Sequence, residues 1–246
     1  MSTLNNKVIL VTGASRGIGA SVAKELAKGG AKLIVNYAGG KAEAEKTVEE
    51  IKAAGGDAIA LQADVSKSAD VSRLFDEAIA HYGRIDVLVN NAGIMITKLL
   101  KDTTDEEFTQ QFDVNVRGTF NTLREAATKL ADKGTIINFS SSTTRLMLPG
   151  YGTYVATKGA VEQMTRVFAK EMGARGITVN AVLPGPVNTE LFTQGKSAEL
   201  ISRLASLNAF NRIGEPDDIA KVVVFLAGDE AKWISGQTIG INGAMA

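Results

Sequence analysis

Three residues have side chains that could move a proton to or from an oxygen atom: Ser141, Tyr154 and Lys158. The pattern of residues 153–173 predicts a helix, so Tyr154 and Lys158, four residues apart, would share one of its faces. An ammonium beside a phenol stabilises the phenolate, so we expect the pKa of Tyr154 to fall below its free value of about 10. Such a tyrosine can donate a proton to a ketone oxygen or accept one from an alcohol.

A glycine-rich segment, TGASRGIG at residues 12–19, lies between a predicted strand and a predicted helix. Glycines permit a tight turn and close backbone approach, and a helix N-terminus offers free N–H groups to a pyrophosphate. We therefore expect a dinucleotide to contact Gly13, Ser15, Arg16, Gly17, Ile18 and Gly19. The segment also matches the G-x-S-x-G motif of hydrolases. That function would need a histidine late in the chain, and the sole histidine, His81, lies early and closes a predicted helix.

The end of the second predicted strand bears on which nicotinamide cofactor binds. A carboxylate at this point normally holds the adenosine ribose of NAD, but the chain has Asn36 followed by Tyr37. Asn36 does not repel a phosphate, and Arg16 could pair with one, so the sequence favours NADP (NADPH). The alternative is that Arg16 faces solvent. The loop from Ala38 to Lys41 would add backbone N–H groups and an ammonium.

Composition excludes several other classes of protein. The 246 residues carry 27 basic and 27 acidic side chains, so there is no excess positive charge for nucleic acid or an anionic membrane surface. Cysteine is absent and histidine occurs once, which argues against disulfides and against a cysteine- or histidine-based metal site. Neither a secretory signal nor a membrane-spanning apolar run is present, so we expect a cytoplasmic protein.

Short β-branched runs alternate with amphipathic stretches along the whole chain. This alternation predicts an α/β fold: one domain over residues 1–246, with a doubly wound parallel sheet of the Rossmann type and helices on both faces. The expected strands are Lys7–Val11, Lys32–Asn36, Ala58–Ala63, Val87–Asn90, Thr135–Ser140, Thr178–Leu183 and Thr238–Ile241. The expected helices are Gly17–Lys28, Lys41–Ala54, Ser68–Tyr82, Thr104–Leu130, Thr153–Gly173 and Pro216–Ala227.

With these pieces placed, the chain resembles the short-chain dehydrogenase/reductase superfamily, and within it the 3-oxoacyl-(acyl-carrier-protein) reductase-like branch. The resemblance rests on an ordered set of motifs: TGASRGIG, Asp64-Val65, Asn90-Asn91-Ala92-Gly93, Asn115, Ser141, Tyr154-x-x-x-Lys158 and Pro184-Gly185. It implies a seven-stranded sheet in the order 3-2-1-4-5-6-7 and a homotetramer. The implied activity is NADPH-dependent reduction of a ketone or acyl thioester. The alternative is a stand-alone carbonyl reductase or sugar dehydrogenase that uses no carrier protein.

The resemblance also implies a role for each matching residue. Asp64 and Val65 would contact adenine, and Asn91, Ala92 and Gly93 would line the cofactor, although Asn90 and Asn91 serve equally well as structural braces. Asn115 would hold a water that links Lys158 to solvent. Lys158 and Tyr154 would contact the nicotinamide ribose, and Ser141 is chosen over Ser140 and Ser142 by its spacing. Tyr151 has Val155 four residues later and so lacks a lysine to polarise it. The nicotinamide carboxamide would contact Pro184, Gly185, Val187 and Thr189.

Apolar residues near these motifs suggest the substrate. They are Met95, Ile96, Leu146, Met147 and Leu148, together with an amphipathic insertion at residues 190–211 that we expect to form a lid, carrying Leu191, Phe192, Leu200, Ile201, Leu204, Leu207 and Phe210. They favour an apolar ketone, unless they pack into the core or a subunit contact. Arg175 matches one basic position expected for carrier docking, but Asp132-Lys133 puts an acid at the other. The stretch Trp233–Ala246 is expected to end in a subunit contact.

Overall fold

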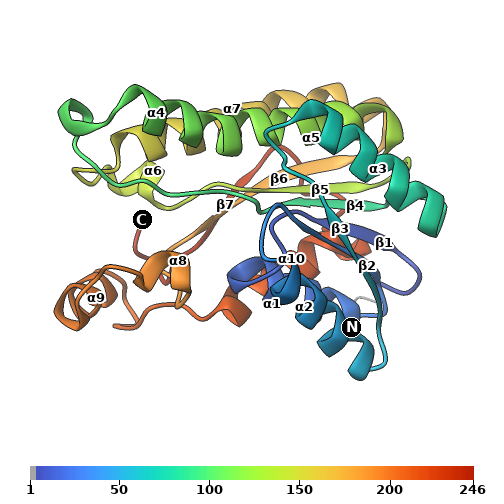
Figure 1. Cartoon of the computed structure of the whole chain (residues 1–246), viewed down its shortest axis with the longest axis horizontal. Helices are drawn as coiled ribbons and strands as arrows, with labels where there is room; N and C mark the ends of the chain where they lie inside the picture. The colour runs from blue at the N-terminus through green and yellow to red at the C-terminus, as the bar shows by residue number, and fades with distance from the viewer. Residues whose placement is uncertain (1–3) are drawn as a thin grey trace.

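The structure is a computed structural model that describes residues 4–246. Within them, a seven-stranded sheet has the order β3-β2-β1-β4-β5-β6-β7 (Figure 1). All neighbouring strands are parallel, which confirms the expected sheet. The strands are β1 (Val8–Val11), β2 (Lys32–Tyr37), β3 (Asp57–Gln62), β4 (Val87–Asn90), β5 (Thr135–Phe139), β6 (Thr178–Pro184) and β7 (Thr238–Ile241).

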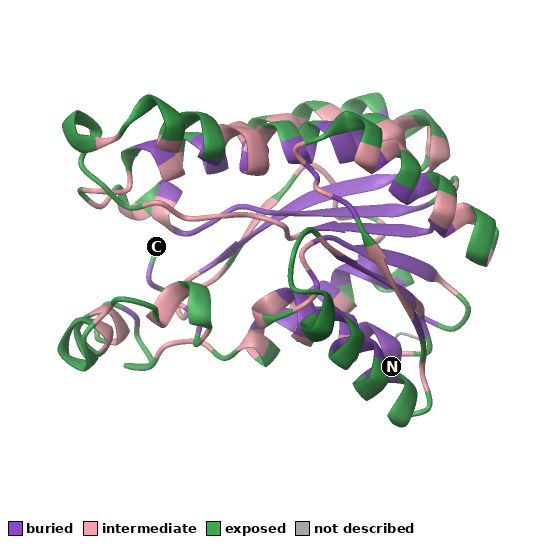
Figure 2. Ribbon diagram, in the orientation of Figure 1, coloured by how far each residue is buried: buried purple, intermediate pink, exposed green. Residues whose placement is uncertain are grey.

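Helices cover both faces of this sheet (Figure 1). One layer contains α1 (Gly17–Lys28), α2 (Lys41–Ala53) and α10 (Pro216–Ala227); the other contains α3 (Ser68–Tyr82), α4 (Asp105–Phe112), α5 (Gly118–Lys129) and α7 (Gly152–Glu171). Two apolar clusters, one on each face, form the core. The central strands are buried along their length (Figure 2), because apolar side chains alternate toward two covered faces.

The helix predicted over Thr104–Leu130 is present but not uniform in its winding. It consists of α4, which ends at Phe112, and α5, which begins at Gly118, with helical backbone between them. Between them, residues 113–117 form one π-helical turn that contains Asn115. A π turn adds one residue to a helix without ending it, and such turns are frequent at functional sites. The hydrophobic period alone does not reveal this extra residue.

Smaller differences concern the ends of elements and short helices that were not expected. β2, β3 and β6 end one residue from their predicted limits, and β5 ends at Phe139 rather than Ser140. The short helices are α6 (Thr143–Leu146), α8 (Glu190–Thr193), α9 (Ala198–Ala205) and the 3₁₀ turns Leu100–Asp102, Gly173–Arg175 and Asp229–Ala231. Among the described residues no helix is long and apolar enough to cross a membrane.

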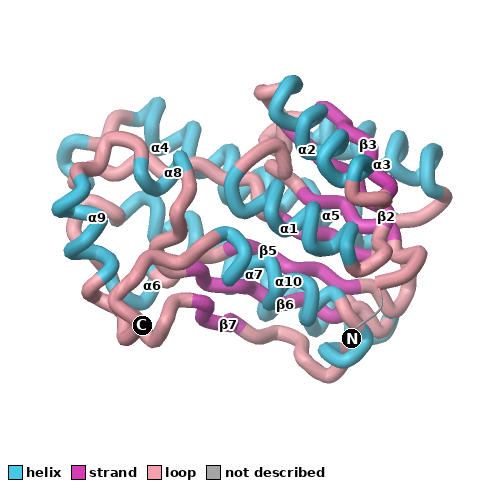
Figure 3. Tube along the Cα trace, turned by 90° about the horizontal axis from the view of Figure 1, so that it is seen from below, coloured by secondary structure: helices cyan, strands magenta, loops and turns pink. Residues whose placement is uncertain are grey.

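The segments that follow β5, β6 and β7 gather at one end of the sheet. Figure 3 shows α6, α8 and α9 at this end, together with the C-terminus. Ligands of open α/β sheets bind outside the carboxyl ends of the strands, where the strand order reverses. Here the order reverses between β1 and β4, so this edge is where a site is expected.

Candidate active site

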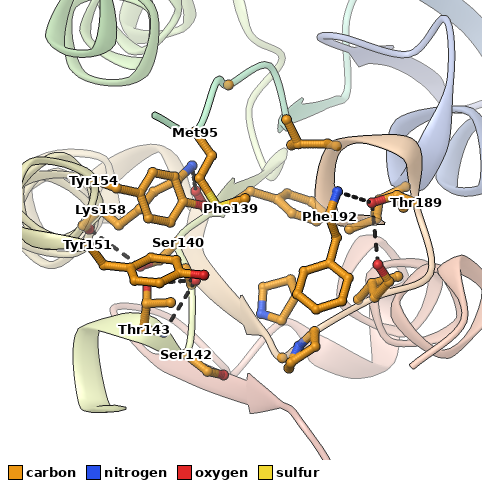
Figure 4. Close-up of a pocket in the computed structure, with 18 of the residues that line it drawn as sticks. Met95, Phe139, Ser140, Ser142, Thr143, Tyr151, Tyr154, Lys158, Thr189 and Phe192 are labelled. Carbon is orange, nitrogen blue, oxygen red and sulfur yellow. Dashed lines mark hydrogen bonds between the residues drawn. The ribbon is translucent and has the colours of Figure 1, made fainter. Parts of the chain in front are cut away.

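Ser141, Tyr154 and Lys158 line one cleft at this edge. Ser141 follows the last residues of β5, and the other two project from the first turns of α7. The Lys158 ammonium nitrogen lies 5.7 Å from the centre of the Tyr154 ring and donates a 2.8 Å hydrogen bond to the carbonyl oxygen of Phe139. Figure 4 shows the tyrosine and lysine side chains on one side of the cleft, facing Phe192 and Thr189.

The expected fall in the pKa of Tyr154 is wrong for this structure. Burial raises the pKa of Tyr154 to about 12, although the neighbouring Ser141 hydroxyl opposes the shift. Burial lowers the pKa of Lys158 to about 8, because desolvation disfavours a charged amine. The lysine donates to the Phe139 carbonyl instead of to the phenol, so its effect on the phenol is smaller than the cost of desolvation. At neutral pH Tyr154 therefore keeps its proton, as an acid that protonates a ketone must.

The neighbouring serines have structural partners. The Ser140 hydroxyl donates to Glu162 at 2.8 Å, and Ser142 donates to the carbonyl oxygen of Leu183 at 2.9 Å. Glu162 is 3% exposed and also accepts from Arg145 at 3.1 Å, so a buried carboxylate anchors the strand end behind the site. The Ser141 hydroxyl accepts from the Thr143 hydroxyl at 2.9 Å. Its own proton remains available to the Tyr154 oxygen, and this hydrogen bond is what opposes the rise in the tyrosine pKa.

Asn115 braces the floor of the site from the π turn. Its side-chain oxygen accepts from the Ile94 amide at 2.9 Å, and its nitrogen donates to the Ile94 carbonyl and to the Thr157 hydroxyl. Thr157 in turn donates to the carbonyl oxygen of Tyr154 at 2.7 Å. Asn115 thus ties the segment after β4 to α7.

The glycine-rich turn forms a cradle for a pyrophosphate. A Cβ at Gly13 would lie 2.8 Å from the Ala92 backbone, and a Cβ at Gly19 would lie 2.3 Å from the Gly13 carbonyl oxygen. Gly17 has φ +58°, a left-handed conformation that favours glycine. Helix α1 begins here without a side-chain cap on Arg16 and without an acidic residue in its first turn. Its free N–H groups and dipole therefore fit a bound anion.

The adenosine end of the cleft is lined by Ser15, Asn36, Asp64, Val65 and Ala92, with Ala38 and Gly39 beside them. Asn36 is only 1% exposed: its oxygen accepts from the Gly13 amide, and its nitrogen donates to Ala63. Asn36 therefore braces the turn, and Tyr37 lies outside the cleft lining and packs against the core. Asp64 accepts from Ser66 at 2.7 Å.

Two predicted contact residues are engaged with the protein itself. The Asn91 amide nitrogen donates to the carbonyls of Thr12 and Gly13, so this residue braces the glycine-rich turn while it also lines the cleft. Arg16 donates to Glu190 at 3.0 Å, and both side chains are well exposed. The guanidinium is therefore largely exposed to solvent, but it also forms an ion pair with Glu190. It spans the mouth of the cleft, from the glycine-rich turn to the start of α8.

The four residues expected at the nicotinamide lie at the end of β6 and just after it, and all of them line the cleft: Pro184, Gly185, Val187 and Thr189. Val187 pairs with Gly214 in a parallel bridge, and Thr189 accepts from the Phe192 amide to cap α8. The cavity beside the glycine-rich turn and the cleft around Tyr154 share six lining residues, namely Ile18, Asn91, Gly93, Ile94, Thr189 and Leu191. They therefore form one continuous cleft, as a dinucleotide that reaches from the glycine-rich turn to Tyr154 requires.

The walls around Tyr154 are largely apolar. Of the residues named from sequence, the cleft is lined by Met95, Leu146, Leu148, Leu191, Phe192 and Leu204. Met147 and Phe210 lie outside it and are 74% and 69% exposed. Tyr151 also lines the cleft, although the sequence analysis gave it no contact with the substrate. The sequence analysis also missed Met245, which lines the cleft from the end of the chain. The only sign of it in the sequence is an apolar residue after the last predicted strand.

Two other chemistries, metal-dependent catalysis and hydrolysis by a serine nucleophile, lack the side chains that they would need at this site within residues 4–246. The described residues contain no cluster of three histidine or acidic side chains that could hold a metal ion. His81 lies on α3 with its ring packed edge-on against Tyr82, and it is not among the residues that line the glycine-rich turn with Ser15. The hydrolase interpretation therefore lacks its base.

Comparisons with known proteins agree with this geometry. The family model described as enoyl-(acyl carrier protein) reductase matches residues 13–245. A probable tetrahydroxynaphthalene reductase of Zymoseptoria tritici is 43% identical over 255 residues, which cover 99% of this chain and 96% of that protein. A 3-oxoacyl-(acyl-carrier-protein) reductase of Staphylococcus epidermidis is 44% identical over 242 residues, with 98% and 99% covered.

Solved structures are similar over the whole chain as well. The crystal structure of an angucycline C-6 ketoreductase with bound NADP superimposes with a TM-score of 0.94 at 37% identity, covering 99% of this chain and 97% of that one. Because 99% of this chain is covered, the alignment extends over the glycine-rich turn, α7 and the insertion after β6. This chain therefore belongs to the short-chain dehydrogenase/reductase superfamily and is an oxidoreductase that acts on carbonyl or hydroxyl groups.

Proposed function

We propose that the protein is an NADPH-dependent ketoreductase whose substrates are free ketones with apolar, ring-bearing substituents. The observation that carries this proposal is the continuity of the cleft, which joins the glycine-rich cradle to Ser141, Tyr154 and Lys158. Relatives named for tetrahydroxynaphthalene reduction and angucycline ketoreduction support it.

The residues of the site have separate roles in this reaction. When bound, NADPH supplies the hydride that adds to the carbonyl carbon. Ser141 and Tyr154 donate hydrogen bonds to the carbonyl oxygen, where negative charge develops. The phenol O–H bond of Tyr154 then breaks, its proton joins that oxygen, and the alcohol forms. The buried ammonium of Lys158, 5.7 Å from the ring centre, stabilises the phenolate until solvent returns the proton.

The preference for NADPH rests on Arg16. No carboxylate stands at position 36, and Arg16 is an exposed guanidinium at the adenosine end of the cleft. Such a group pairs with the 2′-phosphate of NADP through a charge-assisted hydrogen bond. Glu190 is the competing partner in the structure, so phosphate binding exchanges one ion pair for another.

Residues 190–211 act as a substrate lid in this proposal. The segment contains α8 and α9 and extends away from the sheet (Figure 1). Leu191, Phe192 and Leu204 face the cleft from it. Their apolar surface suits a ketone with hydrocarbon or aromatic substituents better than a sugar, whose hydroxyl groups would lose their water without gaining partners.

A second candidate is reduction of 3-oxoacyl groups on a carrier protein, favoured by the 44% identical 3-oxoacyl-(acyl-carrier-protein) reductase. The one basic residue at an expected docking position is already engaged. Arg175 pairs with Asp132 at 2.6 Å and donates to the carbonyl oxygens of Ala127 and Leu130, so it neutralises an acid and caps the end of α5. A carrier with acidic docking residues would find little free positive charge there.

Association into a homotetramer is part of the proposal. Large apolar side chains remain exposed on two sides of the monomer: Phe108, Phe120 and Val167 on α4, α5 and α7, and Phe225 and Trp233 near α10 and β7. Trp233 is 100% exposed, which is costly in water and normally marks an interface. Light scattering should give four times the monomer mass of 25.9 kDa. A monomer at micromolar concentration would contradict this part.

The proposed function is tested by following NADPH oxidation with the purified enzyme. The panel contains acetylnaphthalene, a fused-ring diketone, an acetoacetyl thioester and a reducing sugar, each with NADPH or NADH. We expect the ring-bearing ketones with NADPH to give the highest kcat/KM. A higher value for the thioester would favour the second candidate, and preference for the sugar or for NADH would contradict the proposal.

A further inference from the structure

The C-terminal tail, residues 242–246, enters the same cleft as the catalytic residues. Figure 1 shows the C-terminus between α6 and α8, and Figure 3 shows it beside α6. Met245 is 9% exposed and lines the cleft together with Leu204 and Phe192 of the lid. The tail turns inward after β7, and the subunit contact expected for Trp233–Ala246 stays a prediction.

Backbone conformation turns the tail toward the cleft. Gly243 has φ +63° and Ala244 has φ +59°, so two consecutive residues are left-handed and reverse the chain after Asn242. A Cβ at Gly243 would lie 3.0 Å from the Phe210 ring and 3.1 Å from Asn208, so glycine allows the close approach to the lid. A left-handed alanine is uncommon and costs energy, so the surrounding contacts must hold it in place.

Two hydrogen bonds fix the tail to different parts of the site, and a third holds the end of β7 from which the tail begins. The Asn242 side chain donates to the Ser142 hydroxyl at 2.9 Å, directly beside the catalytic Ser141. The Ala209 amide at the end of the lid donates to the Gly243 carbonyl at 2.9 Å. The Gly185 amide of the nicotinamide loop donates to Ile241, just before the tail, at 3.0 Å.

Asn242 also orders the tail itself. Its side-chain oxygen accepts from the Met245 amide at 3.3 Å, and its nitrogen lies 3.3 Å from the Ala246 carbonyl oxygen. The last residues are therefore held in one arrangement rather than left to fray, as chain ends normally do. A side chain on such an anchored segment presents a defined surface to a ligand.

We propose that the C-terminal tail is one wall of the substrate cleft and that Met245 limits the size of the ketone that reaches Tyr154. The inference rests on the proposed ketoreductase function and extends it to substrate specificity. Methionine suits this position because its flexible, polarizable thioether adapts to flat aromatic surfaces. Met245 forms no hydrogen bond to the catalytic residues, so it acts on substrate shape and not on proton transfer.

Two substitutions at Met245 test the proposal in opposite directions. Met245→Ala widens the cleft, and Met245→Trp narrows it. The readout is the ratio of kcat/KM for acetylnaphthalene to kcat/KM for butanone, with NADPH held saturating. We expect the ratio to rise about tenfold for the alanine variant and to fall about tenfold for the tryptophan variant, as changes of one or a few methylene groups in an apolar pocket do.

Matched variants control for indirect effects. Met245→Leu conserves volume and should leave the ratio within about twofold of wild type. Met147→Ala removes a methionine that is 74% exposed and outside the cleft, so its ratio should be unchanged. The Kd for NADPH should be the same in all variants, because Met245 lines the cleft around Tyr154 and not the part that begins at the glycine-rich turn. Equal ratios in the alanine, tryptophan and wild-type enzymes would overturn the proposal.

A second measurement separates this inference from the proposed function. Calorimetric titration of the enzyme–NADP⁺ complex with acetylnaphthalene reports the shape of the cleft without turnover. Tighter binding by Met245→Ala and weaker binding by Met245→Trp would support the inference that Met245 forms a wall of the cleft. This holds even if the wild-type enzyme reduced none of the ketones, a result that would refute only the proposed function. Identical affinities in an enzyme that does reduce ketones would refute the wall alone.

Discussion

Replacing Lys158 with methionine should abolish reduction and at the same time stabilise the folded protein. The lysine side chain is 5% exposed and has no carboxylate partner among residues 4–246; its ammonium group donates to the Phe139 carbonyl. Burial lowers its pKa from 10.5 to about 8. This lowering of the pKa corresponds to roughly 3 kcal/mol by which folding is disfavoured at neutral pH.

The net gain is smaller, because the variant also loses one hydrogen bond. Removing that bond to a charged donor costs about 1.5 kcal/mol. Methionine fills a similar volume, so no large cavity term is added. We therefore expect Lys158→Met to raise the free energy of unfolding by about 2 kcal/mol at pH 7.

The sign of the pH dependence follows from the lowered pKa. Below pH 8 both the folded and the unfolded states hold the proton, so the full cost is present. Between pH 8 and 10.5 the unfolded state binds more protons, so wild-type stability rises with pH. The advantage of Lys158→Met should therefore narrow by about 2 kcal/mol from pH 7 to pH 9.5. Urea denaturation of wild type and Lys158→Met at several pH values measures this difference in the free energy of unfolding.

Lys158→Gln is the matched control, because it removes the charge but leaves a polar group to desolvate. It should be less stable than Lys158→Met at pH 7. A methionine variant that is less stable than wild type at pH 7, or a difference independent of pH, would refute the argument that Lys158 is a desolvated cation kept for its function.

Further predictions concern the cofactor cradle. Arg16→Ala should raise the KM for NADPH about tenfold to a hundredfold and leave NADH nearly unchanged, since a charge-assisted hydrogen bond contributes about 1.5–3 kcal/mol; equal effects on both cofactors would contradict the assignment. Glu190→Gln should lower the KM for NADPH by up to about fivefold, because an exposed ion pair contributes at most about 1 kcal/mol, and no change would mean that the pair does not compete. Gly19→Ala places a Cβ 2.3 Å from the Gly13 carbonyl, so calorimetry should detect no NADPH binding, whereas Gly159→Ala on α7, where a Cβ meets nothing within 4 Å, should bind normally.

The main outline of the fold could be predicted from the sequence, because it depends on local patterns. Apolar runs of four to six residues between amphipathic stretches predict a parallel sheet whatever the details of packing. Strand order follows from the resemblance to a superfamily, and the structure confirms it. The grouping of Ser141, Tyr154 and Lys158 was also predictable, since the last two are one helical turn apart and the strand before Ser141 ends beside that helix.

Other features depend on interactions that no local pattern contains. The π turn around Asn115 is set by the bonds of this residue to Ile94 and Thr157, which are 21 and 42 residues away. The direction of the Tyr154 shift depends on how much water the folded chain removes from the phenol. Met245 reaches the cleft because two left-handed residues reverse the chain, and a strand period gives no sign of such a reversal.

Asn36 shows a third kind of limit. Its type suggested which cofactor binds, and this inference needed only the absence of a carboxylate. The side chain is 1% exposed and forms hydrogen bonds to Gly13 and Ala63, so it braces the turn. The residue type thus predicted only that position 36 offers no carboxylate to the ribose of NAD. The bracing role of Asn36 depends on the packing of β2 against β3 and the glycine-rich turn, which the residue type does not reveal.

The most direct test of the account is a single-turnover measurement with Tyr154→Phe. The enzyme is loaded with NADPH, mixed with the best ketone of the panel, and followed by NADPH absorbance, with the Kd for NADPH measured in parallel. We expect wild-type affinity for NADPH together with a rate of NADPH oxidation at least about a thousandfold slower, because the phenolic proton is missing and its ring remains. A Tyr154→Phe variant that reduces the ketone at the wild-type rate would contradict the account.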